Sequence, residues 1–218
     1  MVAKQPAPGQ TKTRLCPPLT GELAAELYTC FLADTLDIMR GVSGVDHVIA
    51  YSPEDAAGYF QGLAPDFGLT PQRGASLGER LDNLLTAALA AGAHQAVVMD
   101  SDSPTLPPAY IAAAFDHLAA GADVVLGPCQ DGGYYLIGVT GPQPRLLREV
   151  PMSTPTVLRD TLALAAEIGV RVALLPPWYD VDTANELAHL RAELATAGEE
   201  VAVHTRRFIA SQNGAWPT

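Results

Sequence analysis

The apolar residues of this chain recur in two alternating patterns, one helical and one strand-like. Between residues 21 and 40, Leu23, Leu27, Phe31 and Ile38 fall on one face of a predicted helix. Similar spacing predicts helices at 53–63, 77–89, 107–119 and 156–168, and from residue 183 onward. Short apolar runs predict strands at 45–51, 95–99, 123–127, 134–139 and 170–175. Alternating strands and helices indicate a single-domain α/β fold with a mixed, mainly parallel sheet and helices on both faces.

Two of the predicted strands are joined by a short glycine-rich segment. Asp131-Gly132-Gly133 separates the runs at 123–127 and 134–139, and such residues tolerate the positive φ angles of a tight hairpin. The same glycines would let a ligand approach the backbone, and Asp131 could hold one of its hydroxyl groups. The hairpin and the ligand site are compatible, and the sequence leaves both open.

Charged residues gather just after three of the apolar runs. Lys4, Lys12 and Arg14 follow the short run Val2-Ala3, which predicts a first strand so brief that it is compatible with a clipped start. Asp100 and Asp102 follow the run at 95–99, and Asp180 and Asp182 follow the run at 170–175. Because ligands bind at the carboxyl ends of parallel strands, we expect the three clusters to meet at one edge of the sheet.

The first cluster has the composition of a phosphate-binding loop. Pro6, Pro8 and Gly9 favour a turn whose backbone N–H groups could face an anion, and Lys12 and Arg14 could donate charge-assisted hydrogen bonds to it. Its glycine spacing differs from that of a Walker A loop. The alternative is a solvated Pro/Gly turn that carries two surface cations.

The two aspartate pairs have the composition of a divalent-cation site. Asp100 and Asp102 supply hard oxygen ligands of the kind that Mg²⁺ or Mn²⁺ prefers, and such an ion neutralises a departing phosphate. The alternative is an acidic turn in which an aspartate caps the following helix. If both pairs reach one edge of the sheet, a carboxylate from each, Asp102 and Asp182, could complete a shared site.

Two further segments have both a structural and a functional interpretation. Gln72, Gly78 and Arg80 surround a capping box at 76–79. They could bind the base and a phosphate of a nucleotide, or could lie on the surface. Ser153 and Thr154 precede Pro155 at the expected start of a helix, where they would bind an anion or simply cap the helix.

Composition narrows the class of protein. The chain has 218 residues, 48% of them hydrophobic and 17% charged, which is typical of a globular domain; we place it at 1–198, with a C-terminal tail at 199–218. A net charge of −11 disfavours nucleic acid as a partner. The charged residues among positions 1–21 are nevertheless all basic, which favours local binding of an anion. The widely spaced Cys16, Cys30 and Cys129 fit neither a zinc site nor a disulfide framework. Without an apolar span or a leader pattern, we expect a cytoplasmic protein with no membrane span.

Several motifs in fixed order resemble the DUF2064 family of glycosyltransferase-like proteins, which is similar in turn to 2-phospho-L-lactate and molybdenum-cofactor guanylyltransferases. The motifs are Pro6–Leu15, Gln72, Leu77–Arg80, Ser101–Pro104, Gly127-Pro128, Asp131–Gly138, Ser153-Thr154 and Asp180–Thr183. The resemblance covers roughly residues 2–195 and implies a GT-A fold, the Rossmann-like fold of nucleotide-diphospho-sugar transferases. Asp100 departs from the family pattern, which has glycine at this position.

The resemblance also implies roles for individual residues. Lys12 and Asp102 would be catalytic, and Asp102, Asp182 and Asp100 would hold Mg²⁺ or Mn²⁺. The nucleotide would contact Lys4, Gly9, Lys12, Arg14, Gln72, Gly78 and Arg80. The acceptor would contact Asp131, Gly132, Gly133, Tyr134, Ser153 and Thr154.

These residues favour an Mg²⁺-dependent transferase that binds a nucleotide and a small-molecule acceptor. We expect nucleotidyl transfer, in which a phosphorylated acceptor attacks an NTP and pyrophosphate leaves. One alternative is glycosyl transfer from a nucleotide-diphospho-sugar, and another is a nucleotide-binding protein without catalysis. The sequence leaves open the base, the acceptor and the oligomeric state.

Overall fold

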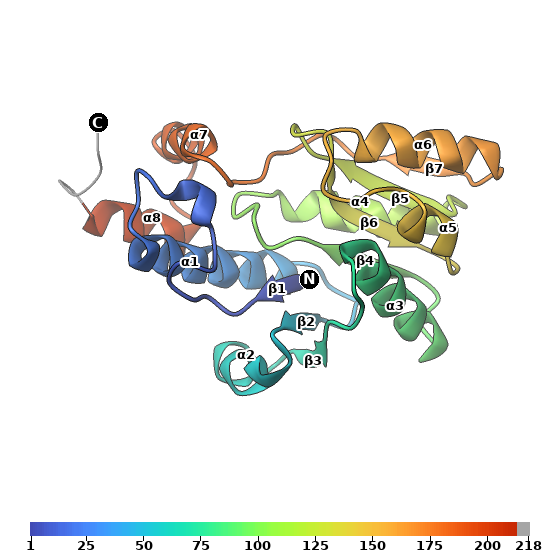
Figure 1. The fold of residues 1–218 in the computed structure, drawn as a ribbon, viewed down its shortest axis with the longest axis horizontal. Helices are drawn as coiled ribbons and strands as arrows, with labels where there is room; N and C mark the ends of the chain where they lie inside the picture. Colours follow the sequence, from blue (N-terminus) through green and yellow to red (C-terminus); the bar gives the residue numbers. More distant parts are fainter. Residues whose placement is uncertain (213–218) are drawn as a thin grey trace.

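The strands form two sheets in the computed structural model, which describes residues 1–212 (Figure 1). The first sheet is parallel, in the order β1 (Val2–Lys4), β2 (Val48–Ser52) and β3 (Gly68–Pro71). The second has the order β4-β6-β5-β7, with bounds Ala96–Met99, Tyr134–Val139, Val124–Pro128 and Val172–Leu174. β6 runs antiparallel to β4 and β5, and β7 runs parallel to β5. β4, β5 and β7 therefore point the same way and end at the same edge.

The helices confirm most of the predicted elements. They are α1 (Gly21–Arg40), α2 (Ala57–Leu63), α3 (Leu77–Ala90), α4 (Pro108–Ala119), α5 (Pro144–Arg148), α6 (Val157–Glu167), α7 (Ala184–Leu194) and α8 (Val203–Ser211). Short 3₁₀ turns cover Thr13–Leu15 (η1) and Glu54–Ala56 (η2), so the helix predicted at 53–63 is divided in two. The sequence patterns did not indicate β3, α5 or α8, which are short or weakly apolar.

The second sheet has a hydrophobic core on each of its faces. Val125 and Leu136 point into the larger core, together with α1 and α4. Their neighbours Leu126 and Ile137 point to the opposite face and pack with α3, α5 and α6. Because successive strand residues face opposite sides, this alternation places helices on both faces, as predicted.

The predicted hairpin joins β5 to β6. The carboxylate of Asp131 accepts the N–H of Gly133 at 2.8 Å, and the N–H of Cys129 donates to the Gly133 carbonyl at 3.0 Å. Gly132 has a φ of 93°, which an L-residue rarely adopts. A Cβ at this position would lie 2.0 Å from the Pro155 carbonyl oxygen, so the hairpin fits tightly against the segment before α6.

The segment predicted as a tail contains α8, which packs along α1. Asp34 of α1 accepts the N–H groups of His204 at 2.8 Å and Thr205 at 2.9 Å, and so caps the start of α8. Residues 213–218 of that segment lie outside the described residues. Within residues 1–212, none of the helices combines the length and the apolar character that a bilayer crossing needs.

Candidate active site

Two pockets meet at the edge where β4 and β7 end. The first, of about 230 Å³, is lined by Lys4, Gln10, Thr11, Lys12, Thr13, Arg14, Tyr28, Asp102 and Asp182. The second, of about 600 Å³, extends toward the β5–β6 hairpin and the segment at 152–157. Arg14, Asp102 and Asp182 line both pockets, so they mark the junction between them.

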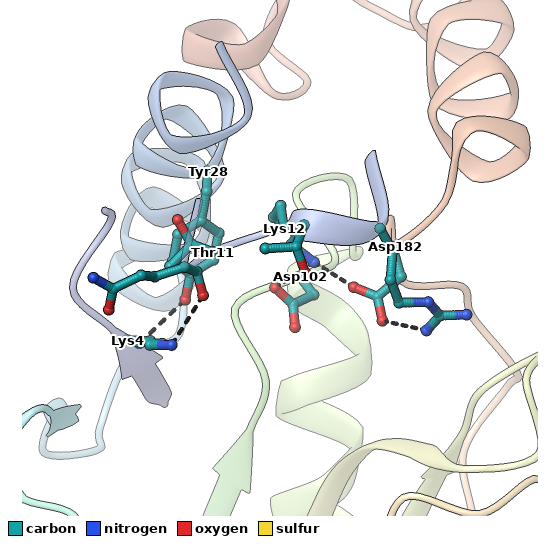
Figure 2. Close-up of a pocket in the computed structure, with 9 residues that line it drawn as sticks. Lys4, Thr11, Lys12, Tyr28, Asp102 and Asp182 are labelled. Atoms are coloured by element: carbon teal, nitrogen blue, oxygen red, sulfur yellow. Dashed lines mark hydrogen bonds and ion pairs between the residues drawn. The ribbon is translucent and has the colours of Figure 1, made fainter. Parts of the chain in front are cut away.

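A buried lysine joins the two predicted carboxylates at this junction (Figure 2). The ammonium of Lys12 lies 2.7 Å from Oδ1 of Asp102 and 2.7 Å from Oδ1 of Asp182. Arg14 approaches the other oxygen of Asp182 at 3.4 Å. Burial opposes the charged form of Lys12, but the two carboxylates outweigh it and raise the pKa of the lysine above its usual value. The aspartates that follow β4 and β7 therefore meet, as their positions predict.

Aromatic rings lie beside the ammonium of Lys12, and a short turn anchors its backbone. Its ammonium lies 5.8 Å from the ring centroids of both Tyr28 and Phe31 on α1, within the range of a cation–π contact. The N–H of Leu15 donates to the Lys12 carbonyl at 2.9 Å, and the side chain of Leu15 is fully buried. The turn η1 is therefore anchored in the core, while Lys12, the residue just before it, points at the aspartates.

Tyr28 connects three segments of the site. Its hydroxyl accepts the N–H of Lys4 at the end of β1 (3.2 Å) and shares a 2.8 Å hydrogen bond with Ser101 after β4. Burial raises the pKa of Tyr28, and the charge of Asp102 raises it further. The sequence patterns do not single out this residue, although a tyrosine on the apolar face of a helix indicates a buried hydroxyl that needs a partner.

Hydrogen bonds also connect the two aspartate segments directly. The N–H of Val181 donates to the Asp102 carbonyl at 2.9 Å, and the Ser103 hydroxyl donates to the Tyr179 carbonyl at 3.0 Å. The carboxylate of Glu186 accepts the N–H groups of Asp182 at 3.0 Å and Thr183 at 2.6 Å. The capping box formed by Thr183 and Glu186 thus fixes the backbone of Asp182 as well as starting α7.

We expect Glu186→Ala to displace Asp182 without removing any group that faces the pockets. Two backbone N–H groups would lose their acceptor, which costs about 1–3 kcal/mol, and the Asp182 carboxylate would lose its fixed position. Glu186→Gln is the matched control, since its amide oxygen can still accept both hydrogen bonds. The free energy of unfolding, measured in urea, and the affinity for nucleotide should both fall in the alanine variant. Both should change little in the glutamine variant. Equal behaviour of the two variants would contradict this positioning role.

The residues at the junction suit a divalent cation. Asp102 and Asp182 offer only oxygen atoms, and their side chains are each 33% exposed where the pockets meet. Hard oxygen donors of this kind are what Mg²⁺ and Mn²⁺ require.

Asp100 contributes differently, because one of its oxygens accepts the N–H of Asp102 at 3.1 Å and shapes the turn. Burial and the charge of Asp102 raise the pKa of Asp100 well above its usual value.

The residues predicted to bind the nucleotide do not all reach the first pocket. Lys4 lines it, with its ammonium 2.9 Å from the Gln10 carbonyl, and Gly9 takes a φ of 70° in the adjoining loop. Gln72 donates to the carbonyls of Ala3 and Ala50, and so ties β1 to β2.

Gly78 and Arg80 lie on α3, outside both pockets. A Cβ at Gly78 would lie 1.8 Å from the Leu147 carbonyl oxygen, so this glycine permits close packing of α3 against α5. Gln72, Gly78 and Arg80 therefore do not line the first pocket, and their contact with a nucleotide stays a prediction.

The residues predicted to bind the acceptor come together at the second pocket. Asp131, Gly133, Tyr134, Ser153 and Thr154 line it, and Gly132 supports it by accepting the N–H of Leu158 at 3.0 Å. Ser153 and Thr154 do not start a helix, contrary to expectation, because α6 begins at Val157. They form the loop before it, where Ser153 has a φ of 62°.

The second pocket also contains a group that the sequence did not single out. Cys129, Asp131 and Asp180 place ligand-type atoms within 4.8 Å of one another. The thiol of Cys129 lies 3.2 Å from Oδ1 of Asp180, and burial together with this carboxylate raises the pKa of the thiol. In this arrangement the protonated thiol donates a hydrogen bond to Asp180.

Comparison with known proteins identifies both a family and a fold. Residues 35–154 match the sequence profile of a family described as "Uncharacterized protein conserved in bacteria (DUF2064)". A search of the curated proteins finds no match.

A solved structure of a candidate nucleotide-diphospho-sugar transferase from Desulfovibrio desulfuricans G20 is similar at 30% identity and a TM-score of 0.89. The match covers 98% of this chain and 94% of that one. A CMP:2-keto-3-deoxy-manno-octonic acid synthetase complexed with CTP is similar at 13% identity and a TM-score of 0.56, over 89% of this chain and 96% of that one. A cytidylyltransferase from Leptospira borgpetersenii serovar Hardjo-bovis is similar at 12% identity and a TM-score of 0.55, over 99% and 94% of the two chains. The fold is that of the nucleotide-diphospho-sugar transferases.

Proposed function

Because the chain belongs to the DUF2064 family, whose matching region spans residues 35–154, we propose that it is a transferase that uses a nucleotide substrate. We propose further that it transfers a nucleotidyl group from an NTP to a phosphorylated acceptor. The observation that carries this proposal is the junction of the two pockets, where Lys12 joins Asp102 to Asp182. The similarity in fold to a synthetase that binds CTP and to a cytidylyltransferase supports it.

The first pocket is the site for the nucleotide. It combines three cations, Lys4, Lys12 and Arg14, with the two carboxylates of Asp102 and Asp182. A triphosphate would gain charge-assisted hydrogen bonds from these cations, and the buried position of Lys12 makes its contribution stronger than in water. The ring of Tyr28 closes the side of the pocket that faces α1 (Figure 2).

The second pocket is the site for the acceptor. Five aspartates line it, namely Asp100, Asp102, Asp131, Asp180 and Asp182, and Arg14 is the cation among its described residues. A phosphorylated acceptor would therefore place its phosphate at the Arg14 end, next to the nucleotide. Tyr134 and Leu77 line the wall of the pocket and suit a less polar part of the acceptor.

The chemistry requires no side-chain nucleophile. An oxygen of the acceptor phosphate attacks the α-phosphorus, the bond to the β-phosphate oxygen breaks, and pyrophosphate leaves. Lys12 and Arg14 neutralise the charge that develops, and the two pockets orient the reactants. Asp102 and Asp182 are the residues that would hold Mg²⁺ or Mn²⁺, an ion that would supply further neutralisation of the phosphates.

Acceptor-independent turnover tests this proposal. Nucleotides and nucleotide sugars are first screened for thermal stabilisation with and without Mg²⁺. The stabilising compound is then incubated at high protein concentration, with water as the acceptor. Attack on the α-phosphorus of an NTP yields an NMP and pyrophosphate, and this result would support nucleotidyl transfer.

A second candidate function is glycosyl transfer, and the 30% identity to a candidate nucleotide-diphospho-sugar transferase favours it. In that reaction the same cations would stabilise a departing nucleoside diphosphate, and Asp131 would hold a sugar or acceptor hydroxyl. Release of NDP and free sugar from a nucleotide sugar would support glycosyl transfer over nucleotidyl transfer. Nucleotide stabilisation without any turnover would instead indicate a binding protein.

A further inference from the structure

The free protein already holds a cation between the two carboxylates assigned to the divalent ion. The ammonium of Lys12 is 2.7 Å from each carboxylate, and its side chain is only 5% exposed. The ammonium supplies one positive charge between the two carboxylates, and Arg14 supplies a second at 3.4 Å from Asp182. An ion that enters the free protein must therefore replace two short charge-assisted hydrogen bonds instead of filling an unpaired anionic site.

We propose that Lys12 is a placeholder cation that makes binding of the divalent ion depend on prior binding of the nucleotide. In the free protein Lys12 pairs with Asp102 and Asp182. When a triphosphate enters the first pocket, the ammonium moves to the phosphates, and the carboxylates become available to the ion. This inference rests on the proposed function, because it assigns an order of binding to the same site.

The surroundings of Lys12 suit such a movement. The lysine lines the first pocket together with Lys4 and Arg14, so the two other cations attract phosphate to its immediate vicinity. An ammonium on a flexible stem can exchange one anion for another, whereas a guanidinium prefers a fixed, forked geometry with its carboxylates. The rest of the site stays in place during the exchange, since Asp102 and Asp182 are tied through backbone hydrogen bonds to Val181 and Glu186.

Removing the placeholder tests the inference without any nucleotide. In Lys12→Met, the two carboxylates would lose the cation between them and keep only the longer 3.4 Å contact of Asp182 with Arg14, so the variant should be less stable than the wild type. We expect Mn²⁺ alone to restore that stability and to bind the variant roughly 10- to 100-fold more tightly than the wild type. Electron paramagnetic resonance of free Mn²⁺ measures the affinity, and thermal unfolding measures the rescue.

The matched control is Arg171→Met. It removes another cation from an ion pair, that with Asp123 at 2.8 Å, away from both pockets. Its affinity for Mn²⁺ should equal that of the wild type. Equal Mn²⁺ affinity in Lys12→Met and the wild type would overturn the placeholder role.

A second variant covers the case in which Lys12→Met does not fold. Lys12→Arg keeps the positive charge but exchanges partners less readily, so Mn²⁺ should stabilise the nucleotide-bound variant less than the nucleotide-bound wild type. Undiminished stabilisation would contradict the inference. The Mn²⁺ measurements on Lys12→Met use no nucleotide, so they are independent of the proposed function. That function fails separately if no NTP or nucleotide sugar stabilises the wild type.

Discussion

Asp102→Asn is expected to lower transfer activity by on the order of a thousandfold while the protein remains folded. The amide is nearly isosteric with the carboxylate but carries no charge, so Asp102 could no longer help to hold a divalent ion beside the phosphates. Lys12 would keep one counterion, Asp182, at 2.7 Å, which limits the loss of stability. We therefore expect a loss of function that unfolding measurements do not explain.

Binding should report the same change before any acceptor is known. In the wild type, Mg²⁺ should increase the thermal stabilisation that a nucleotide provides, and in Asp102→Asn this increase should disappear. Asp116→Asn is the control, because Asp116 is an exposed aspartate on α4 that lines neither pocket. If Asp102→Asn retained wild-type nucleotide affinity and its full dependence on Mg²⁺, Asp102 would not belong to the proposed site.

The convergence of Asp102 and Asp182 could be predicted because it depends on topology alone. Each residue follows an apolar run long enough to be recognised as a strand, and strands that run the same way deliver their ends to one edge. The structure shows the same direction for β4 and β7 even though β6 runs the opposite way between them. The hairpin that reverses β6 was also predictable, since Asp131-Gly132-Gly133 provides the turn.

Other features could not be predicted, because they depend on which elements face each other. Gly78 belongs to a motif whose residues predict a nucleotide contact, and in the fold it packs against α5, a helix of five residues that lacks a clear periodic pattern. Gln72 follows β3, whose sequence Gly-Leu-Thr-Pro gives little indication of a strand. The roles of Tyr28 and Glu186 likewise depend on contacts between distant segments, and only their residue types hinted at them.

Gly132→Ala is expected to destabilise the protein by about 2–4 kcal/mol. The alanine would have to adopt a φ near 93°, and its Cβ would lie 2.0 Å from the Pro155 carbonyl oxygen. Either the hairpin or the segment before α6 must move. Both carry residues of the second pocket, Asp131 on one side and Ser153 and Thr154 on the other.

The control for this variant is Gly141→Ala. No atom lies within 4 Å of a Cβ built at Gly141, and its φ is not in the left-handed region, so its stability should stay within about 0.5 kcal/mol of the wild type. Urea unfolding gives the free energy of unfolding of both variants. If Gly132→Ala weakens acceptor-dependent turnover more than nucleotide binding, the hairpin and the loop before α6 form the acceptor side of the site. An equal loss of both would mean that the change spreads to the junction at Asp102 and Asp182, and the separation into two functional pockets would be wrong.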